Sequence, residues 1–246
     1  MIHNKMGKVK IILLAGPSSS GKTTTARKLA VYLKARGFKT HSISTDDYFV
    51  NRVDTPKKPN GEYDFETIEA VDTTLFNKHL LKLLDGDKVS LPEFNFVIGE
   101  REYKGKTLQL GENDIFIIEG LHALNPELTM AIDDKNKFKI YISPLTQLNI
   151  DNHNRIHTSD TRRLRRIIRD NMYRGRSAAD TLRLWKNILE GEEKYVFPYQ
   201  SEADVIINSA LIYELGVLKI YAEPLLFSVS EDDEVYPEAI RLINFL

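Results

Sequence analysis

The chain has 246 residues, 42% of them hydrophobic, with 34 basic and 35 acidic side chains and a formal net charge of −1. This balance argues against a protein that coats nucleic acid or a membrane surface, so neither is an expected partner. The absence of cysteine excludes disulfides, thiolate chemistry and zinc held by cysteine ligands. No apolar run approaches the ~18 residues of a membrane span and the start lacks a signal-peptide pattern, so we expect a soluble, cytoplasmic protein.

Apolar runs that end in polar or glycine residues alternate with helical stretches, which predicts a mostly parallel sheet flanked by helices. The expected core strands are 10–15, 40–44, 115–118, 137–142 and 204–208. The expected helices are 23–36 and 73–84, with a β-hairpin insertion over about 88–110 whose strands are 89–96 and 102–110 and whose turn lies near Gly99. An arginine-rich helical lid follows over about 150–190, and a helical tail over about 211–246 is expected to be interrupted at Pro224 and Pro237. We predict a single α/β domain over residues 1–246.

The segment 16–23, GPSSSGKT, fits the phosphate-binding pattern G-x-x-x-x-G-K-[ST] between a predicted strand and a predicted helix. Backbone N–H groups and the helix N-terminus favour phosphate in such a loop, its lysine reaches the β- and γ-phosphates and its threonine ligates Mg²⁺. A glycine-serine turn before an ordinary helix is the alternative. We therefore expect ATP and Mg²⁺ as cofactors, with nucleotide contacts from Gly16, Ser18, Ser19, Ser20, Gly21, Lys22, Thr23 and Thr24.

Acidic residues follow two of the predicted core strands. Asp46 and Asp47 come shortly after strand 40–44, and Glu119 ends the strand in the segment 113–120, NDIFIIEG. The carboxyl ends of parallel strands border the ligand crevice, so these carboxylates should lie beside the phosphates. One could accept the proton of an attacking hydroxyl, and Glu119 could hold Mg²⁺ or align the attacking group. The alternatives are an Asx turn or helix cap at Asp46–Asp47 and a structural ion pair at Glu119.

Seven arginines fall within the fifteen residues 162–176. On a helix, Arg162, Arg166 and Arg169 would share one face. Because such a face repels itself, we expect it to be mobile until anions order it, and ATP phosphates suit the planar guanidinium fork. A solvated basic face and an RNA-binding stripe are the alternatives. The RNA reading is weakened by the acidic residues elsewhere and by the lack of interleaved aromatic side chains.

Two further residues stand out. His122 follows Glu119-Gly120 at the expected active edge of the sheet, although no histidine has a convincing metal-ligand spacing. Trp185 is expected to pack between helices rather than to stack on a base.

Taken in order, these segments resemble the uridine kinase and phosphoribulokinase family of P-loop kinases, and most of all the uridine-cytidine kinases. The resemblance runs from about residue 10 to 208 and rests on AGPSSSGKTTTA (15–26), STDDYF (44–49), YDFETIEAVD (63–72), IIEGLHAL (117–124), RRLRRIIRDNMYRGRS (162–177) and ADVIIN (203–208). It implies a P-loop kinase fold with a five-stranded parallel sheet, a hairpin that closes over a nucleoside and an arginine-bearing lid.

The resemblance also implies residue roles, which add to those that the motifs indicate. It places the general base on Asp46, the ribose contact on Asp64, and lid arginines on Arg166, Arg169, Arg174 and Arg176. The expected catalytic residues are Asp46, Lys22, Glu119 and Arg169, with Thr23 and Glu119 on the metal. Arg169 and Arg174 join the nucleotide contacts, and the expected substrate contacts are Asp46, Tyr48, Asp64, Phe94, Arg166 and Arg176.

The departures from the family pattern concern the acceptor. Phe94, Gly99 and Leu184 stand where a tyrosine, a histidine and a glutamine contact the pyrimidine, and Phe65-Glu66 replace a Pro-His pair. Losing such hydrogen bonds can cost ~10⁴-fold in discrimination. We expect ATP-dependent phosphorylation of a small-molecule hydroxyl, with the 5′-hydroxyl of a uridine- or cytidine-like nucleoside as the first candidate. A sugar phosphate or pantothenate-like alcohol as acceptor, or an ATP-switched RNA-binding or regulatory protein, are the alternatives, and the sequence leaves a homo-oligomer open.

Overall fold

The computed structural model describes residues 9–59, 61–111, 114–146, 149, 152–153 and 155–246. The start of the predicted domain, residue 113 of the NDIFIIEG segment and parts of the beginning of the predicted lid lie outside these ranges. The chain divides into two compact units. The first comprises the described residues up to Pro17, Lys22–Ile142 and Gly191–Ile207, and the second comprises Ser18–Gly21, Ser143–Glu190 and Asn208–Leu246. The prediction of one kinase domain over 1–246 stays a prediction.

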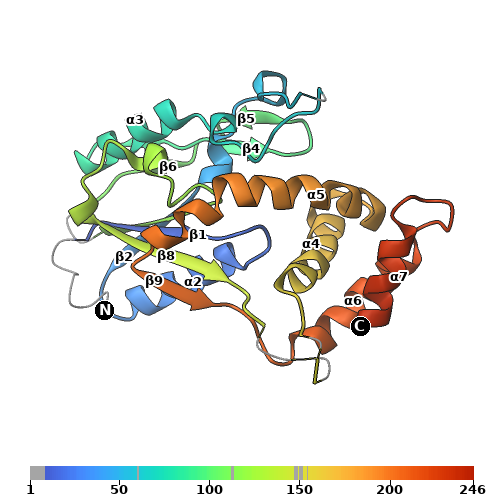
Figure 1. Cartoon of the computed structure of the whole chain (residues 1–246). Helices are drawn as coiled ribbons and strands as arrows, with labels where there is room; N and C mark the ends of the chain where they lie inside the picture. Colours follow the sequence, from blue (N-terminus) through green and yellow to red (C-terminus); the bar gives the residue numbers. More distant parts are fainter. Residues whose placement is uncertain (1–8, 60, 112–113, 147–148, 150–151, 154) are drawn as a thin grey trace. The chain divides into compact units, whose positions relative to one another are not determined.

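Within the described ranges, a five-stranded sheet forms the centre of the first unit (Figure 1). Its strands in spatial order are β2 (Lys39–Ser44), β7 (Asp114–Glu119), β1 (Ile11–Ala15), β8 (Lys137–Ser143) and β9 (Val205–Asn208). β1 pairs in parallel with β7 and with β8, and β2 pairs in parallel with β7. The predicted parallel core is confirmed, and every strand lies within one residue of its expected ends.

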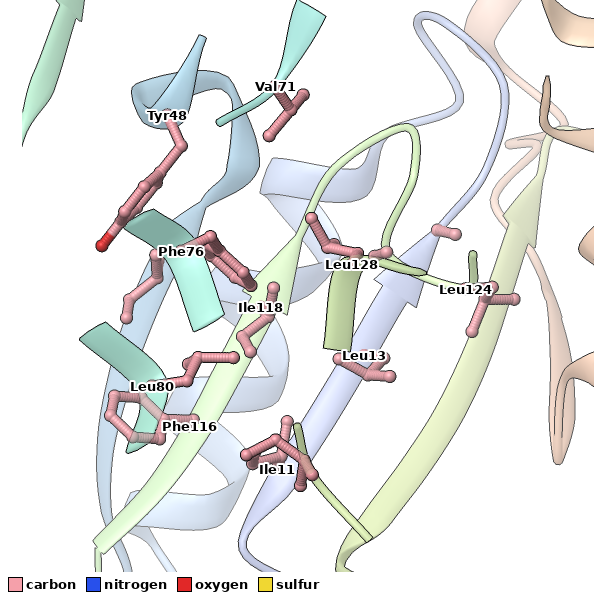
Figure 2. Packing of buried hydrophobic residues seen from close by; sticks show 14 of the residues in the cluster. Ile11, Leu13, Tyr48, Val71, Phe76, Leu80, Phe116, Ile118, Leu124 and Leu128 are labelled. Carbon is pink, nitrogen blue, oxygen red and sulfur yellow. The ribbon is translucent and has the colours of Figure 1, made fainter. Parts of the chain in front are cut away.

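Helices cover both faces of this sheet. β1 and β7 have apolar side chains on both faces and are therefore buried along their whole lengths. α2 (Lys22–Lys34) packs on one face, and the cluster there includes Ile12, Leu14, Ala26, Leu33, Ile115 and Ile117. α3 (Thr73–Leu84) packs on the other face, and Figure 2 shows its Phe76 and Leu80 beside Phe116 and Ile118 of β7. The bounds of α3 are those predicted, since Asp72 caps its first turn by accepting from Leu75 N at 2.9 Å.

The hairpin insertion is present but is divided into two short antiparallel ladders. β3 (Val89–Ser90) pairs with β6 (Thr107–Leu108), and β4 (Glu93–Asn95) pairs with β5 (Glu100–Glu102). The prediction of two continuous strands was too long, because Pro92 has no N–H with which to continue the ladder from β3 into β4. The turn at Gly99 is confirmed, and that residue has a φ of 77°, which favours glycine.

Short 3-10 helices connect the other elements of the first unit. They are η1 (Thr45–Tyr48), η2 (Arg52–Asp54), η3 (Ile68–Ala70), η4 (Pro126–Thr129), η5 (Asp134–Asn136) and η6 (Phe197–Glu202). η1 follows β2 directly, so it determines where the acidic pair after that strand lies.

The second unit is helical in its described part. Its helices are α4 (Thr158–Arg174), α5 (Ala178–Tyr195, assigned to this unit up to Glu190), α6 (Glu214–Phe227) and α7 (Tyr236–Phe245). They share an apolar core that includes Leu164, Ile167, Leu182, Ala222, Leu226, Ala239 and Leu242. No helix in the described ranges is both long and apolar enough to span a bilayer.

One expectation for the tail was wrong. Pro224 does not interrupt a helix but lies inside α6, and Pro237 lies in the first turn of α7. A proline in the first turn removes an N–H that has no helical partner anyway. Inside α6 a proline removes one backbone hydrogen bond. Burial of the flanking Ala222 and Leu226 against the core of the unit keeps that helix continuous.

Candidate active site

The phosphate-binding loop connects β1 to α2, as the sequence motif requires. The Lys22 side chain folds back over the start of the loop, where its Nζ donates to Gly16 O at 2.9 Å and to Pro17 O at 3.1 Å. Ser19 is the non-glycine residue with a positive φ in the described ranges, at 57°. Such backbone strain is typical of segments that are shaped for a ligand.

Three serine hydroxyls belong to the same loop. The Oγ atoms of Ser19 and Ser20 are buried, and the structure gives them no hydrogen-bond partner. A buried hydroxyl without a partner is costly, and phosphate oxygens would supply acceptors for both. The residues of the loop therefore fit a nucleotide phosphate group. Thr24, also predicted to contact the nucleotide, is exposed in the first turn of α2.

Thr23 and Glu119 form the pair predicted to hold a metal. The Thr23 Oγ1 donates to Glu119 Oε1 at 2.9 Å, which joins the first turn of α2 to the end of β7. Burial raises the pKa of the Glu119 carboxyl, the charge of Asp46 raises it further, and Lys22 and Thr23 oppose the shift. In the described ranges no three acidic or histidine side chains gather to form a complete metal cage. A hydroxyl and one carboxylate suit Mg²⁺, which usually takes its remaining oxygens from water and substrate phosphate.

Asp46 and Asp47 have different surroundings although they are neighbours in η1. Asp47 Oδ1 accepts from Phe94 N of the hairpin at 3.4 Å, and burial raises the pKa of this carboxyl. Asp46 is half-buried, and its charge raises the pKa of Glu119 and opposes the lowering of the His122 pKa. Asp46 therefore lies at the sheet edge with Glu119, while Asp47 attaches the hairpin.

The ends of β2 and β7 approach each other very closely. A Cβ on Gly120 would overlap the Oγ1 of Thr45, the first residue of η1. Only glycine fits there without moving Thr45, and the contact sets the separation between the strand ends that carry Asp46 and Glu119. Sequence reasoning did not assign this role to Gly120, because the clash involves a residue 75 positions away.

His122 lies behind this edge and is 2% exposed. Burial lowers the pKa of its ring to about 4, although Asp46 and the backbone at Glu66 and Thr67 favour the proton. The ring is thus neutral near pH 7, and its Nδ1 has no hydrogen-bond partner. It lies between the strand ends and the segment 64–67, where Asp64, the predicted ribose contact, accepts from Glu66 N at 3.2 Å.

The hairpin carries an aromatic cluster at the positions where the family resemblance predicted contacts to a base. Phe94 is mostly buried, with its ring centroid 5.6 Å from that of Phe49 and 5.2 Å from that of Phe96. Gly99 has no room for a side chain, because a Cβ there would lie 2.7 Å from Arg52 Nε. The hairpin is held by Arg101, whose Nη2 donates to Phe49 O at 3.0 Å.

Tyr48, predicted to contact substrate, is buried in the structure. It is 1% exposed, and its ring packs edge-on against Phe76 at 4.8 Å between centroids. Its hydroxyl is 3.1 Å from His79 Nδ1, and burial raises the pKa of the phenol. The 3-10 turn of η1 directs this side chain into the core, as Figure 2 shows, and its contact with substrate stays a prediction.

In the second unit, three arginines of α4 contact the phosphate-binding loop itself. Arg162 Nη1 donates to Ser18 O at 3.2 Å, Arg165 Nη1 donates to Ser19 O at 3.1 Å, and Arg166 donates to the Ser18 hydroxyl. Arginine side chains therefore contact the loop, as expected for this helix. Of the three, only Arg166 was predicted to be a site residue.

Arg169 and Arg174, predicted nucleotide contacts, share one buried carboxylate. Arg169 Nη2 donates to Asp170 Oδ1 at 2.8 Å, and Arg174 Nε lies 3.8 Å from the same atom. Arg176, a predicted substrate contact, donates through its backbone N–H to Asp170 O at 3.1 Å, just after the left-handed Gly175 that ends α4. Asp170 was missed in the sequence, where its only signal is an acidic residue among seven arginines.

Other side chains of this unit also pack against or pair with neighbouring helices. Trp185 is buried, with the Arg162 and Arg163 guanidinium carbons 5.5 and 5.3 Å from its ring centroid, so it packs between helices as expected. Arg165 also forms an ion pair with Glu214 of α6, which no motif indicated. The alternative that the arginines form a solvated basic face does not hold for Arg162 and Arg166, which are buried.

Comparison with known proteins now decides the family. The model of the phosphoribulokinase / uridine kinase family matches residues 11–213. The chain belongs to this family. It is an ATP-dependent kinase of the uridine kinase-like type, and α6 and α7 lie beyond the matched range.

Individual relatives agree with the family assignment. A uridine kinase of Brevibacillus brevis is 28% identical over 203 residues, which cover 82% of this chain and 86% of that protein. A uridine kinase of Schizosaccharomyces pombe is 31% identical over 204 residues, which cover 81% of this chain and 40% of that protein. The structure of a "possible uridine kinase" from Bacillus stearothermophilus has a TM-score of 0.51 at 18% identity, covers 84% of this chain and 99% of that one, and shows the shared fold.

Proposed function

We propose that this kinase uses ATP and Mg²⁺ to phosphorylate the 5′-hydroxyl of a pyrimidine-like nucleoside. The observation that carries the proposal is the arrangement at one sheet edge, where the Thr23–Glu119 pair, Lys22 and Asp46 come together. The relatives named uridine kinases support the choice of acceptor.

In this proposal the loop residues bind and orient the triphosphate. Backbone N–H groups of 16–23 hold the phosphates, and the Lys22 ammonium exchanges its bonds to two loop carbonyls for bonds to phosphate oxygens. Mg²⁺, when bound by Thr23 and Glu119, neutralises charge on the phosphates. The buried Ser19 and Ser20 hydroxyls gain the acceptors that they lack in the free protein.

Asp46 is proposed as the general base. The acceptor oxygen attacks the γ-phosphorus, its proton passes to the Asp46 carboxylate, and the bond to the bridging oxygen breaks to release ADP. Asp47 is the less suitable neighbour, because its carboxylate is engaged with the hairpin at Phe94 N.

The arginines of α4 are proposed to stabilise the charge of the transferring phosphoryl group. Arg169 and Arg174 would contact the nucleotide, and Arg166 and Arg176 the substrate side. This role is supported by a contact within the second unit, where Arg166 donates a hydrogen bond to the Ser18 hydroxyl of the phosphate-binding loop.

One observation favours a second candidate acceptor. The buried Phe94 and Gly99, which has no room for a side chain, stand where the resemblance places polar contacts to the base, so these two positions offer uracil or cytosine no side-chain hydrogen bonds. A kinase of this family acting on a sugar phosphate or a pantothenate-like alcohol would not need those contacts.

ATP consumption by the full chain, measured against a panel of nucleosides, sugar phosphates and pantothenate, tests both candidates. We expect uridine or cytidine to stimulate ADP release, and Lys22→Ala to reduce that rate at least ~10²-fold while retaining its circular dichroism spectrum. Stimulation by a sugar phosphate or pantothenate alone would leave a kinase but reject the nucleoside. ATP binding without acceptor-dependent ADP release, together with salt-sensitive RNA binding, would favour the regulatory alternative.

A further inference from the structure

α6 is mainly apolar, with Glu214, Lys219 and Glu223 as its charged residues, and large apolar side chains also lie on the side of the helix that is not buried. Ala222 and Leu226 lie in the core that the second unit builds with Leu164, Ile167 and Leu242. A helix that is apolar on every side is normally buried on every side. The exposed apolar side of α6, a helix of the second unit labelled in Figure 1, therefore calls for a partner.

We define the α6 outer face as six large apolar residues on this helix and the turn before it. They are Ile212, Tyr213, Val217, Ile220, Tyr221 and Phe227, whose exposed fractions run from 46% at Val217 to 86% at Ile212. Since a large side chain exposes roughly 150–250 Å² when uncovered, the face presents on the order of 800 Å². That is about what one partner contributes to a stable protein interface, and it exceeds the patches that monomers usually leave open.

We propose that the α6 outer face binds the same face of a second copy of this chain, with the two helices antiparallel about a two-fold axis near Ile220. Positions 213 and 227 are equally far from Ile220, so Tyr213 would meet the partner's Phe227. Gly216 would meet the partner's Pro224 in the same way. Nothing lies within 4 Å of a Cβ placed on Gly216, so the helices can approach closely at that point. A face that is symmetric about its centre suits the self-complementary interface of a two-fold dimer.

Charge also favours a second copy over a membrane surface. Residues 211–246 contain seven acidic and two basic side chains, a net charge of 2 − 7 = −5. Helices that bind anionic bilayers carry several lysines and arginines beside their apolar face, whereas this segment has only Lys219 and Arg241. Four of the acids are consecutive, at 231–234 in the connection to α7. Antiparallel packing places the two acidic connections at opposite ends of a 14-residue helix, roughly 20 Å apart and beyond the screening length at physiological salt.

The absence of cysteine from the chain allows a direct test of the axis. Ile220→Cys introduces the only thiol, and two copies of it would face each other across the proposed axis. Val31→Cys is the matched control, on an exposed apolar position of α2 in the first unit. We expect mild oxidation to produce a disulfide-linked dimer with Ile220→Cys in high yield and little with Val31→Cys. Equal cross-linking of the two variants would overturn the proposal.

Sedimentation equilibrium of the full chain tests the affinity. We expect a dimer in wild type, and at least a ~10²-fold weaker association in Ile220→Asp, because two carboxylates would meet at the axis. Val31→Asp should associate like wild type. A wild-type monomer at about 100 µM would overturn the proposal, since a dimer this weak has no specific interface. Monomeric protein that co-sediments with phosphatidylcholine–phosphatidylserine vesicles would assign the face to a membrane instead.

Discussion

Asp170 and Arg166 form a buried ion pair one helical turn apart in α4, with 3.2 Å between Oδ2 and Nε. Burial raises the pKa of Asp170, but Arg166, Arg169 and Arg174 lower it by more, so the net shift is downward and the carboxylate stays charged. The arginine-rich face therefore has an internal counter-charge. The expectation that repulsion keeps this segment mobile without nucleotide did not include this carboxylate.

Asp170→Asn should strongly destabilise the protein. Removing one partner of a buried charge network leaves the arginines uncompensated, which typically costs about 3–5 kcal/mol. Urea unfolding measures the loss, and hydrogen exchange of α4 should become faster in the absence of nucleotide. Asp180→Asn, at a half-exposed pair with Arg183, is the control and should change stability by less than ~1 kcal/mol. Equal stability of Asp170→Asn and wild type would show that the network does not hold α4.

Asp46→Asn should reduce turnover by ~10²–10⁴ with ATP affinity nearly unchanged, because asparagine keeps the shape but cannot accept a proton. Asp47→Asn should have a much smaller effect, since an amide oxygen can still accept from Phe94 N. Steady-state kinetics and nucleotide titration compare the two. The reverse ranking would move the base to Asp47.

Gly120→Ala should lower both activity and stability. The new methyl group would overlap Thr45, and such overpacking typically costs about 1–3 kcal/mol and separates the strand ends that carry Asp46 and Glu119. The double variant Gly120→Ala, Thr45→Gly should recover part of the turnover, because the atoms that clash are then absent. Additive losses in the double-mutant cycle would show that this contact is not the cause.

Glu119→Gln should separate function from stability. Because burial and then Asp46 raise the pKa of Glu119 above its ordinary value, the folded state holds the proton more tightly than the unfolded state. The stability that this proton provides is present in acid and is lost as pH rises through the raised pKa. The variant should therefore melt higher than wild type at pH 7, with the difference vanishing near pH 4, while its turnover collapses. A lower melting temperature at pH 7 would mean that the carboxylate is stabilised by a charge partner.

His122 should contribute to acid sensitivity. Its pKa is lowered to about 4 by burial, so the unfolded state takes up this proton first as pH falls. The stability it contributes is complete above about pH 6.5 and is lost between there and about pH 4, on the order of 3 kcal/mol. In urea unfolding across this range, His122→Gln should flatten the dependence of the unfolding free energy on pH. His157→Gln, an exposed control, should not. An unchanged slope in His122→Gln would assign the loss to other groups.

The regular elements were predictable from sequence because their signals are local. The strands appear as apolar runs, and α3 begins at Thr73 directly after its cap Asp72, which accepts from a residue three positions away. The hairpin was harder, because Pro92 divides a segment whose composition still favours strands. At Pro224 the error was the opposite one. An interruption was predicted, but the packing of α6 outweighs the one hydrogen bond that the proline removes.

The sequence by itself determined the parallel sheet and the phosphate-binding loop, because the loop is one contiguous segment between a strand and a helix. Only the tertiary structure separated Asp46 from Asp47 and placed Tyr48 in the core, since the direction of each side chain depends on the turn of η1 and on what packs against it. The same holds for the contact of Gly120 with Thr45 and for the bond of Arg165 to Ser19, which join residues far apart in the chain. Composition and spacing describe neighbours along the chain, whereas excluded volume and buried charge act between whichever groups the fold brings together.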